Sequence, residues 1–334
     1  TDDVRRLFAA NSRTPDERAG DLDAQVGANV LGVARLAEHA DAPLAEVTDY
    51  GERMMAAALA AAPDGTWTFE DQLDSTGPQT AGSQPAMVRV RLTIHGERAR
   101  FDFTGTDPQR PGNVNAVEAV TVSAVSYAVR SVFAPDVPAN GGALRRIEVV
   151  APPGTVVAAR PPVAVGAGNV EVSQRLTDAL LKPFGILACS QGTMNNVLFG
   201  NKDFSYYETI CGGCGAGPGF HGASAVHHHM TNTRITDPEI MEFKFPVRLK
   251  AFSIRKGSGG EGKYRGGDGV VRVIQFLEPV TLSVLTQHRK SGPYGLEGGR
   301  SGKKGEQCVI TGSGKRVELD SVDGYDIQKG DRFV

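Results

Sequence analysis

The chain has 334 residues, of which 40% are apolar and 22% are charged, a balance typical of a folded globular protein. Its 36 basic and 38 acidic residues give a formal net charge of -2, so neither nucleic acid nor an anionic membrane is expected as a partner. The longest nearly apolar run, 119–129, is too short to cross a bilayer, no basic-then-apolar leader is visible, and four cysteines make no disulfide framework, so we expect a cytoplasmic protein.

The first part of the chain is predicted to be helical. Thr14 is a candidate N-cap, Pro15 occupies the first helical position, and Glu17 completes a capping box. Apolar residues then recur at three- and four-residue steps and predict one buried stripe, formed by Leu22, Val26, Val30, Val33 and Ala37. A second helix is expected over 44–62, with a stripe formed by Leu44, Val47, Met54 and Ala58.

Strands follow the two helices. Apolar residues alternate with polar ones over 88–94 and again over 99–103, and Gly96 lies between the two runs, so a hairpin with one buried face is predicted. The segment 115–133 is apolar on nearly every side, which indicates a helix buried in a core or an interface.

The second half of the chain changes character. Ser173 is expected to cap a short helix, and beyond Gly192 short β runs alternate with glycine-rich turns. Because the helices come early and the strands late, we predict an α+β fold. We expect a helical and hairpin region over 1–160 and a glycine-rich α+β region over 161–334 that carries the candidate site, the two forming one continuous body. The first residue is not Met and "KGDRFV" reads as an interrupted strand, so we expect a fragment of a larger polypeptide.

The glycine-rich run "GGCGAGPG", 212–219, resembles a phosphate-binding loop only superficially. It lacks the Lys-Ser/Thr pair that such a loop needs. Either it is a tight turn that brings backbone close to backbone, or its N–H groups approach a substrate or an oxyanion. Cys211 and Cys214 form a lone C-x-x-C pair that we interpret as small-residue filler.

Four of the seven histidines fall close together, at His221, His227, His228 and His229. In a strand, His227 and His229 would point to one face and His228 to the other. Acidic residues follow at Asp237, Glu239 and Glu242, and imidazole with carboxylate suits Zn or Mn. The spacing leaves open a metal site, an acid/base or hydrogen-bonding role for His221 or His227, and a purely structural role.

Several long motifs resemble the hydantoinase B/oxoprolinase family in the same order along the chain. The sequences of these motifs are most similar to the C-terminal, B-type part of the family's 5-oxoprolinase branch. The motifs are "RTPDERAGDLDAQVGAN", "GAGNVEVSQRLTDALL", "FHGASAVHHHMTNTRITDPEIMEFKFPVRL", "GSGGEGKYRGGDGVVRVIQF" and "GPYGLEGGRSG".

The resemblance implies a hydrolase acting on cyclic amides in two steps. An A-type ATPase partner, as a separate subunit or a fused half, uses ATP to phosphorylate the carbonyl oxygen of a small lactam. The B-type part then opens the activated ring, and 5-oxoproline would give glutamate. A hetero-oligomer is therefore expected. The family's divalent metal ligands lie upstream of the motif that starts at Arg13, so no metal site is assigned within this chain.

The residues inside the matching motifs are the candidates for the site. We expect His221 and His227 to bind substrate or move protons, as the catalytic pair. Tyr206 and Glu208 are expected to line the pocket. Asn232 and Arg234 are expected to orient a carboxylate or a phosphorylated intermediate, since arginine suits bidentate contacts with oxyanions.

Two alternatives remain open. The first is a subunit of an ATP-dependent carboxylase of the same family, acting on acetone or acetophenone. The second is a non-catalytic fragment that stabilises the assembly while the chemistry takes place elsewhere.

Overall fold

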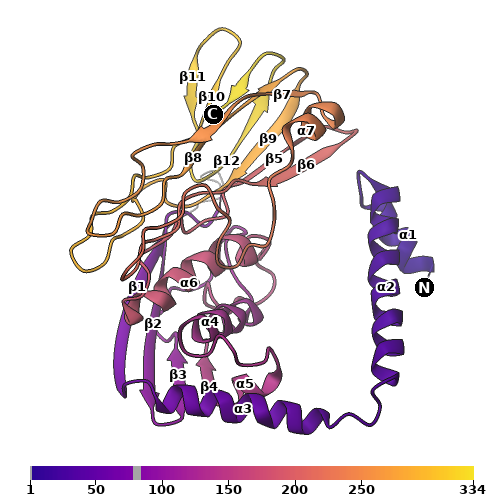
Figure 1. Cartoon of the computed structure of the whole chain (residues 1–334). Coiled ribbons are helices and arrows are strands. Elements are labelled where there is room, and N and C mark those ends of the chain that lie inside the picture. The colour runs from indigo at the N-terminus through magenta and orange to yellow at the C-terminus, as the bar shows by residue number, and fades with distance from the viewer. Residues whose placement is uncertain (1, 78–83) are drawn as a thin grey trace.

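The computed structural model describes residues 2–77 and 84–334. These residues form the predicted α+β fold (Figure 1). The helices are α1 (Asp2–Ala10), α2 (Pro15–Ala37), α3 (Leu44–Ala60), α4 (Glu118–Phe133), α5 (Gly141–Leu144), the π-helix η2 (Gly168–Val172), α6 (Ser173–Leu181), the 3-10 helix η3 (Lys182–Phe184) and α7 (Pro238–Lys244). No helix in the described part of the chain has the length and hydropathy needed to span a membrane.

The strands of the described residues form three sheets, in the orders β1-β2-β3-β4, β11-β10-β13-β8-β7 and β12-β9-β5-β6. The strands are β1 (Gly65–Leu73), β2 (Ala86–His95), β3 (Arg98–Asp102), β4 (Ile147–Val150), β5 (Asn196–Gly200), β6 (Ser205–Thr209), β7 (Val247–Ile254), β8 (Val270–Phe276), β9 (Val280–Leu285), β10 (Cys308–Ile310), β11 (Arg316–Glu318), β12 (Val322–Ile327) and β13 (Arg332–Phe333). The short β runs predicted after Gly192 are therefore confirmed.

The hairpin predicted over 88–103 is confirmed as β2 and β3, which pair antiparallel with Ile94 opposite Ala99. Gly96 turns between them with a positive φ of 54°, a conformation that glycine adopts without strain. Every second residue of β2 is buried, because successive side chains point to opposite faces of the sheet. The alternation of apolar residues thus correctly predicted both the hairpin and its buried face.

The first core lies between this sheet and helices α3, α4 and α6. Helix α4 confirms the buried helix predicted over 115–133, and its residues Ala124 and Val125 are fully buried. Helix α3 also forms as predicted, but its predicted stripe is only half correct: Met54 and Ala58 are partly buried against the core. Leu44 and Val47 are exposed and Met55 and Leu59 are buried, because only the second half of the helix lies against the sheet.

Helix α2 begins at Pro15 as predicted, but its surroundings differ from the prediction. Thr14 occupies the N-cap without a side-chain hydrogen bond, so the expected capping box does not form. The stripe is exposed rather than buried, and Val33 is 70% accessible to solvent. Figure 1 shows α1 and α2 standing away from the rest of the molecule, so none of the three sheets covers this apolar face, and α1 contacts α2.

The second core lies between the other two sheets, at the top of Figure 1. Phe199 on β5 and Leu282 on β9 pack from one sheet, and Ile274 and Phe276 on β8 pack from the other. The two sheets therefore form a sandwich with a shared apolar interior.

The helix predicted after Ser173 forms as α6, but Ser173 is not its cap. The π-helix η2 leads directly into α6, and the Ser173 hydroxyl donates to the carbonyl of Asn169 at 2.6 Å. All nine residues of α6 are buried, including Arg175 and Asp178. This helix, entered through a π-helical turn, carries charged side chains into the interior between the first core and the glycine-rich loops.

Candidate functional site

A cavity with a volume of about 520 Å³ lies among the glycine-rich loops. Its lining residues fall mainly in four segments, 188–197, 210–218, 255–272 and 286–308. We call this space the glycine-walled cavity. A Cβ atom on Gly213 would collide with the carbonyl oxygen of Gly267, and one on Gly260 would collide with that of Arg300. The loops therefore need glycine where backbone packs on backbone, as one interpretation of 212–219 predicted.

Basic side chains outnumber acidic ones in the cavity lining. The basic residues are Arg255, Lys263, Arg272, Arg289, Arg300, Lys303 and Arg316, and the acidic ones are Glu261, Glu297 and Glu306. Arg289 donates to Asn195 Oδ1 and Gln307 Oε1, both at 2.9 Å. Burial lowers the pKa of Arg289 to about 10, so its guanidinium remains charged at neutral pH. A cavity of this kind favours an anionic ligand.

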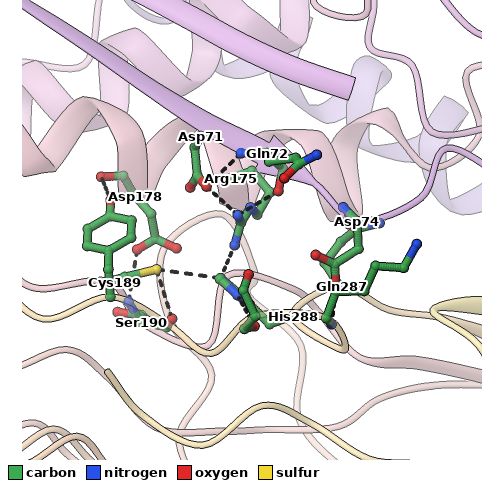
Figure 2. A network of polar contacts seen from close by, with 12 residues as sticks. Asp71, Gln72, Asp74, Arg175, Asp178, Cys189, Ser190, Gln287 and His288 are labelled. Atoms are coloured by element: carbon green, nitrogen blue, oxygen red, sulfur yellow. Dashed lines mark hydrogen bonds and ion pairs between the residues drawn. The ribbon is translucent and has the colours of Figure 1, made fainter. Parts of the chain in front are cut away.

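A buried arginine next to the cavity contacts residues from two other segments of the chain. Arg175, on α6, forms an ion pair with Asp71 on β1 and donates to the carbonyl of Gln72 at 2.8 Å. Its other amino group contacts His288 Nε2. Figure 2 shows the guanidinium between Asp71 and Gln72 on one side and His288 on the other. The contacts of Arg175 thus connect β1, α6 and the loop that follows β9.

The contacts of His288 fix its charge and tautomer. Burial, followed by the charge of Arg175, lowers the pKa of His288 to about 3, so the ring is neutral at neutral pH. Because a guanidinium can only donate, Nε2 accepts from Arg175. Nδ1 then carries the hydrogen and donates to the carbonyl of Ser291 at 3.0 Å.

Cys189 lies close to His288 but is not arranged as an activated thiol. Its Sγ is 3.6 Å from His288 Nε2. Burial, with the charge of Asp178, raises the pKa of Cys189 well above its usual value. A reactive cysteine needs a lowered pKa and a base that accepts its proton, whereas here Nε2 is already occupied by Arg175. The pair is therefore a packed, neutral contact.

A second polar cluster lies behind the same loop. His229 Nε2 is 3.1 Å from Ser190 Oγ and 3.4 Å from Asp178 Oδ1. Burial alone would raise the pKa of Asp178, but the hydrogen bond and charge of His229 lower it to about 2. Asp178 is consequently ionised at neutral pH, and Ser190 lines the glycine-walled cavity.

The predicted residues Tyr206 and Glu208 lie together on β6. The Tyr206 hydroxyl donates to Glu208 Oε1 at 3.0 Å, and Arg272 donates to the same oxygen at 2.8 Å. Tyr206 and Glu208 are buried in or beside the second core, and Arg272 is the one member of this group that lines the cavity. Burial raises the pKa of Glu208, and Arg272 opposes that rise.

No contact joins the other four predicted residues to one another among the hydrogen bonds and ion pairs of the described residues. His221 is exposed and its Nδ1 accepts the backbone N–H of Arg265 at 2.8 Å. His227 is partly buried, and burial lowers its pKa. Asn232 and Arg234 are exposed on the loop before α7. None of the six predicted residues lines the glycine-walled cavity, so their functional roles stay predictions.

The histidine segment is not the strand that its sequence suggested. Residues 227 and 228 belong to no helix or strand, and His229 begins a turn with a positive φ of 53°. His228 and His229 face the interior, and burial, followed by the charge of His229, lowers the pKa of His228 to about 4. Among residues 2–77 and 84–334, no three or more His, Cys, Asp or Glu side chains are grouped so as to hold a metal ion.

Comparison with known proteins places the whole chain in one family. The family model described as hydantoinase B/oxoprolinase matches residues 1–334. The chain belongs to the hydantoinase B/oxoprolinase family. It is 41% identical to the 5-oxoprolinase of Dictyostelium discoideum over 99% of its own length and 27% of that protein. It spans about a quarter of the length of the 5-oxoprolinases that it matches.

Two solved structures share the fold of this hydantoinase B/oxoprolinase chain. The ATP-dependent caprolactamase from Pseudomonas jessenii superposes with a TM-score of 0.86 over 99% of this chain and 62% of the other, at 22% identity. A nucleotide-free acetone carboxylase superposes with a TM-score of 0.74 over 85% of this chain and 46% of the other, at 20% identity.

Five residues around the site were not predicted from the sequence: Arg175, Asp178, Ser190, His288 and Arg289. Two of them had a usable signal in the family motif "GAGNVEVSQRLTDALL". Arg175 and Asp178 are charged residues three positions apart in a short helix whose leucines predict burial, which indicates buried, paired charges. The others are single polar residues in loops, and only the fold shows which neighbours they have.

Proposed function

We propose that this chain is the B-type part of an ATP-dependent cyclic-amide hydrolase, which opens the phosphorylated ring of 5-oxoproline or a related lactam. The observation that carries the proposal is the glycine-walled cavity, whose lining is predominantly basic and includes the half-buried guanidinium of Arg289. A phosphorylated lactam is anionic, and 5-oxoproline adds a carboxylate. The 41% identity to a 5-oxoprolinase makes 5-oxoproline the first substrate to test.

The proposed reaction begins with a ring whose carbonyl oxygen carries a phosphoryl group. Water adds to the ring carbon, the carbon–nitrogen bond breaks as the nitrogen takes up a proton, and a second water hydrolyses the acyl phosphate. Positive charge near the phosphoryl and carboxylate oxygens stabilises the added negative charge along this path. Arg289 and Arg255 are the proposed source, because both line the cavity and both are held by hydrogen bonds.

The phosphoryl group is proposed to come from ATP on an A-type partner, a separate subunit or a fused half. The chain lacks the Lys-Ser/Thr pair of a phosphate-binding loop in its glycine-rich run, which agrees with this division of labour. The ATP-dependent caprolactamase that shares this fold also supports an ATP requirement. The family's metal is proposed to bind outside this chain, since its described residues offer no set of three ligands.

His221 and His227 are retained as proposed substrate-binding or proton-transferring residues. They follow the segment 210–218, which lines the cavity directly. Asn232 and Arg234 are exposed and could meet a substrate only if a partner delivers it to that loop. Tyr206 and Glu208 would act on the cavity through Arg272, which contacts Glu208 and lines the wall.

The test is ATP-dependent release of glutamate from 5-oxoproline by the complete protein or complex that contains this chain. Arg289→Met is expected to raise KM by at least about tenfold, because a charged hydrogen bond contributes roughly 1.5–3 kcal/mol. Arg248→Met is the matched control, since Arg248 lies on β7, is 61% exposed and does not line the cavity. No ATP-dependent glutamate release by the wild type would refute the proposed substrate.

The carboxylase alternative is kept because an acetone carboxylase shares the fold. The same preparation is assayed for ATP- and bicarbonate-dependent carboxylation of acetone. Carboxylation without glutamate release would establish the alternative. Full turnover by both Arg289→Met and a His221→Ala/His227→Ala double variant would instead favour a non-catalytic assembly role.

A further inference from the structure

Four segments far apart in the sequence bring polar side chains together behind the glycine-rich loop. Tyr127 comes from α4, Asp178 from α6, Ser190 from the loop after η3, and His229 from the turn in the histidine segment. Tyr127 Oη lies 3.3 Å from His229 Nδ1, while His229 Nε2 faces both Ser190 Oγ and Asp178 Oδ1. The side chains of His229 and Asp178 are 4% and 1% exposed, so water does not compete for these contacts.

The position of Asp178 determines which ring nitrogen of His229 carries hydrogen. An ionised carboxylate can only accept, so the nitrogen that faces it must be a donor. Nε2 therefore bears hydrogen whether the ring is neutral or protonated. The backbone N–H of Ser190 also donates to Asp178 Oδ1 at 3.0 Å, which fixes the carboxylate relative to the serine.

These contacts separate the cluster from a nucleophilic serine triad. In such a triad the serine faces an unprotonated ring nitrogen, and the carboxylate binds the opposite nitrogen. Here Ser190 and Asp178 face the same nitrogen, and that nitrogen carries hydrogen. His229 in this arrangement cannot take the proton of Ser190.

The same contacts leave the hydroxyl hydrogen of Ser190 available. A serine hydroxyl has two acceptor positions and one donor. The backbone N–H of Gly215 occupies one acceptor position at 3.0 Å, and His229 Nε2–H occupies the other at 3.1 Å. The hydrogen therefore points to a third partner, and the Cys214 thiol is a neighbouring acceptor, since the Ser190 hydroxyl opposes the rise of the Cys214 pKa.

Cys214 is a weak acceptor that a ligand can replace. Burial raises the pKa of Cys214 to about 11, so it is a neutral thiol rather than a thiolate at neutral pH. Ser190 and Cys214 both line the glycine-walled cavity. A carbonyl or phosphoryl oxygen is a much stronger acceptor than a thiol sulfur.

We infer that the Ser190 hydroxyl is a fixed hydrogen-bond donor to the carbonyl-derived oxygen of a cyclic amide in the glycine-walled cavity. Asp178 and His229 are positioning residues that hold it in the donating orientation. The identity of the ligand rests on the proposed function. A preorganised donor aimed at an oxygen that gains negative charge accelerates ring opening without forming a covalent bond.

The experiment uses 5-oxoproline labelled with ¹³C at its ring carbonyl and bound to the complete protein or complex. Isotope-edited infrared spectroscopy measures the carbonyl stretch, and steady-state kinetics measure glutamate release. Ser190→Ala is expected to move the stretch to higher wavenumber and to lower kcat by about 100-fold. Ser190→Thr, which keeps the hydroxyl, is expected to restore much of both.

Ser173→Ala is the matched control. The Ser173 side chain is also buried and donates a hydrogen bond, but Ser173 does not line the cavity, so neither readout should change. If Ser190→Ala does not fold, Ser190→Cys gives the same comparison, because a thiol of similar size is a weak donor.

Two results would overturn different parts of this inference. An unchanged stretch and unchanged kcat in Ser190→Ala, or in Ser190→Cys, would overturn the donor role while leaving the proposed function intact, because the wild type still binds and opens 5-oxoproline. A wild type that neither binds nor opens 5-oxoproline would overturn the proposed substrate, and the assigned ligand of Ser190 with it.

Discussion

Arg175 and His288 are in direct contact although 113 positions separate them in the sequence. The guanidinium also pairs with Asp71, so one buried cation connects the end of β1, helix α6 and the loop after β9. That loop continues into the wall of the glycine-walled cavity, and its position therefore depends on charges buried beneath it.

Asp71→Asn is expected to destabilise the fold by about 3–5 kcal/mol, because it removes the partner of a buried charge. The side chain of Arg175 is only 2% exposed and cannot be solvated instead. Chemical denaturation measures the free energy of unfolding. Glu148→Gln removes one of the two acidic partners of the half-exposed Arg100 and is the control, with an expected loss below about 1 kcal/mol. Equal losses in the two variants would contradict a structural role for the buried pair.

Glu208→Gln tests a second buried ion pair, which joins Glu208 on β6 to Arg272 on β8. Arg272 is 2% exposed and Glu208 1% exposed, so a loss of roughly 3 kcal/mol or more is expected. Tyr206→Phe removes a single hydrogen bond to the same carboxylate and should cost only about 1 kcal/mol. The two denaturation midpoints are compared directly, and a larger effect from Tyr206→Phe would show that the ion pair is not the dominant contact.

Acid should destabilise the protein through its buried histidines. The pKa of His288 is about 3 in the folded state, below the usual value of 6.5, so the unfolded chain binds a proton that the folded chain excludes as pH falls below about 6.5. Between pH 7 and 5 this costs about 2 kcal/mol. His288→Gln keeps an acceptor for Arg175 but has no imidazole to titrate. Between pH 7 and 5 its free energy of unfolding should therefore fall by about 2 kcal/mol less than that of the wild type. Parallel pH profiles for variant and wild type would show that His288 does not stay neutral.

Glu171 should have the opposite dependence. Burial raises the pKa of Glu171 to about 8, so its folded carboxyl is protonated near neutral pH while the unfolded one is not. Its stabilising contribution is complete below about pH 4.5 and is lost as pH rises toward 8. Unfolding measured at pH 6 and pH 8 should show a loss of about 2 kcal/mol in the wild type that is absent in Glu171→Gln. The glutamine keeps an acceptor for Asn196 Nδ2, now 3.3 Å away, so an unchanged pH dependence would mean that Glu171 is ionised in the fold.

The sequence predicted local structure better than it predicted surroundings. The alternation over 88–103 was sufficient for the hairpin, because one face of a strand is buried and its side chains alternate. The stripe of α2 was equally clear, yet it lies exposed, since periodicity predicts an apolar face but not the element that covers it. A short segment of sequence does not show which other segment of the chain will pack against it.

The site illustrates the same limit. The glycine-rich run at 212–219 pointed to close backbone approach, which the cavity wall shows. The histidine segment drew attention to His221 and His227, whereas the structure buries His229 against Ser190 and Asp178. Those contacts join residues 39 and more positions apart, and His229 has a positive φ, which the predicted strand does not allow.

The most direct test of the central claim is a crystal structure of the complete protein or complex with 5-oxoproline and a non-hydrolysable ATP analogue. The ring is predicted to occupy the glycine-walled cavity, with its carbonyl oxygen at hydrogen-bond distance from Ser190 Oγ and its carboxylate near Arg289. A ring bound elsewhere, with this cavity holding only solvent, would contradict the account.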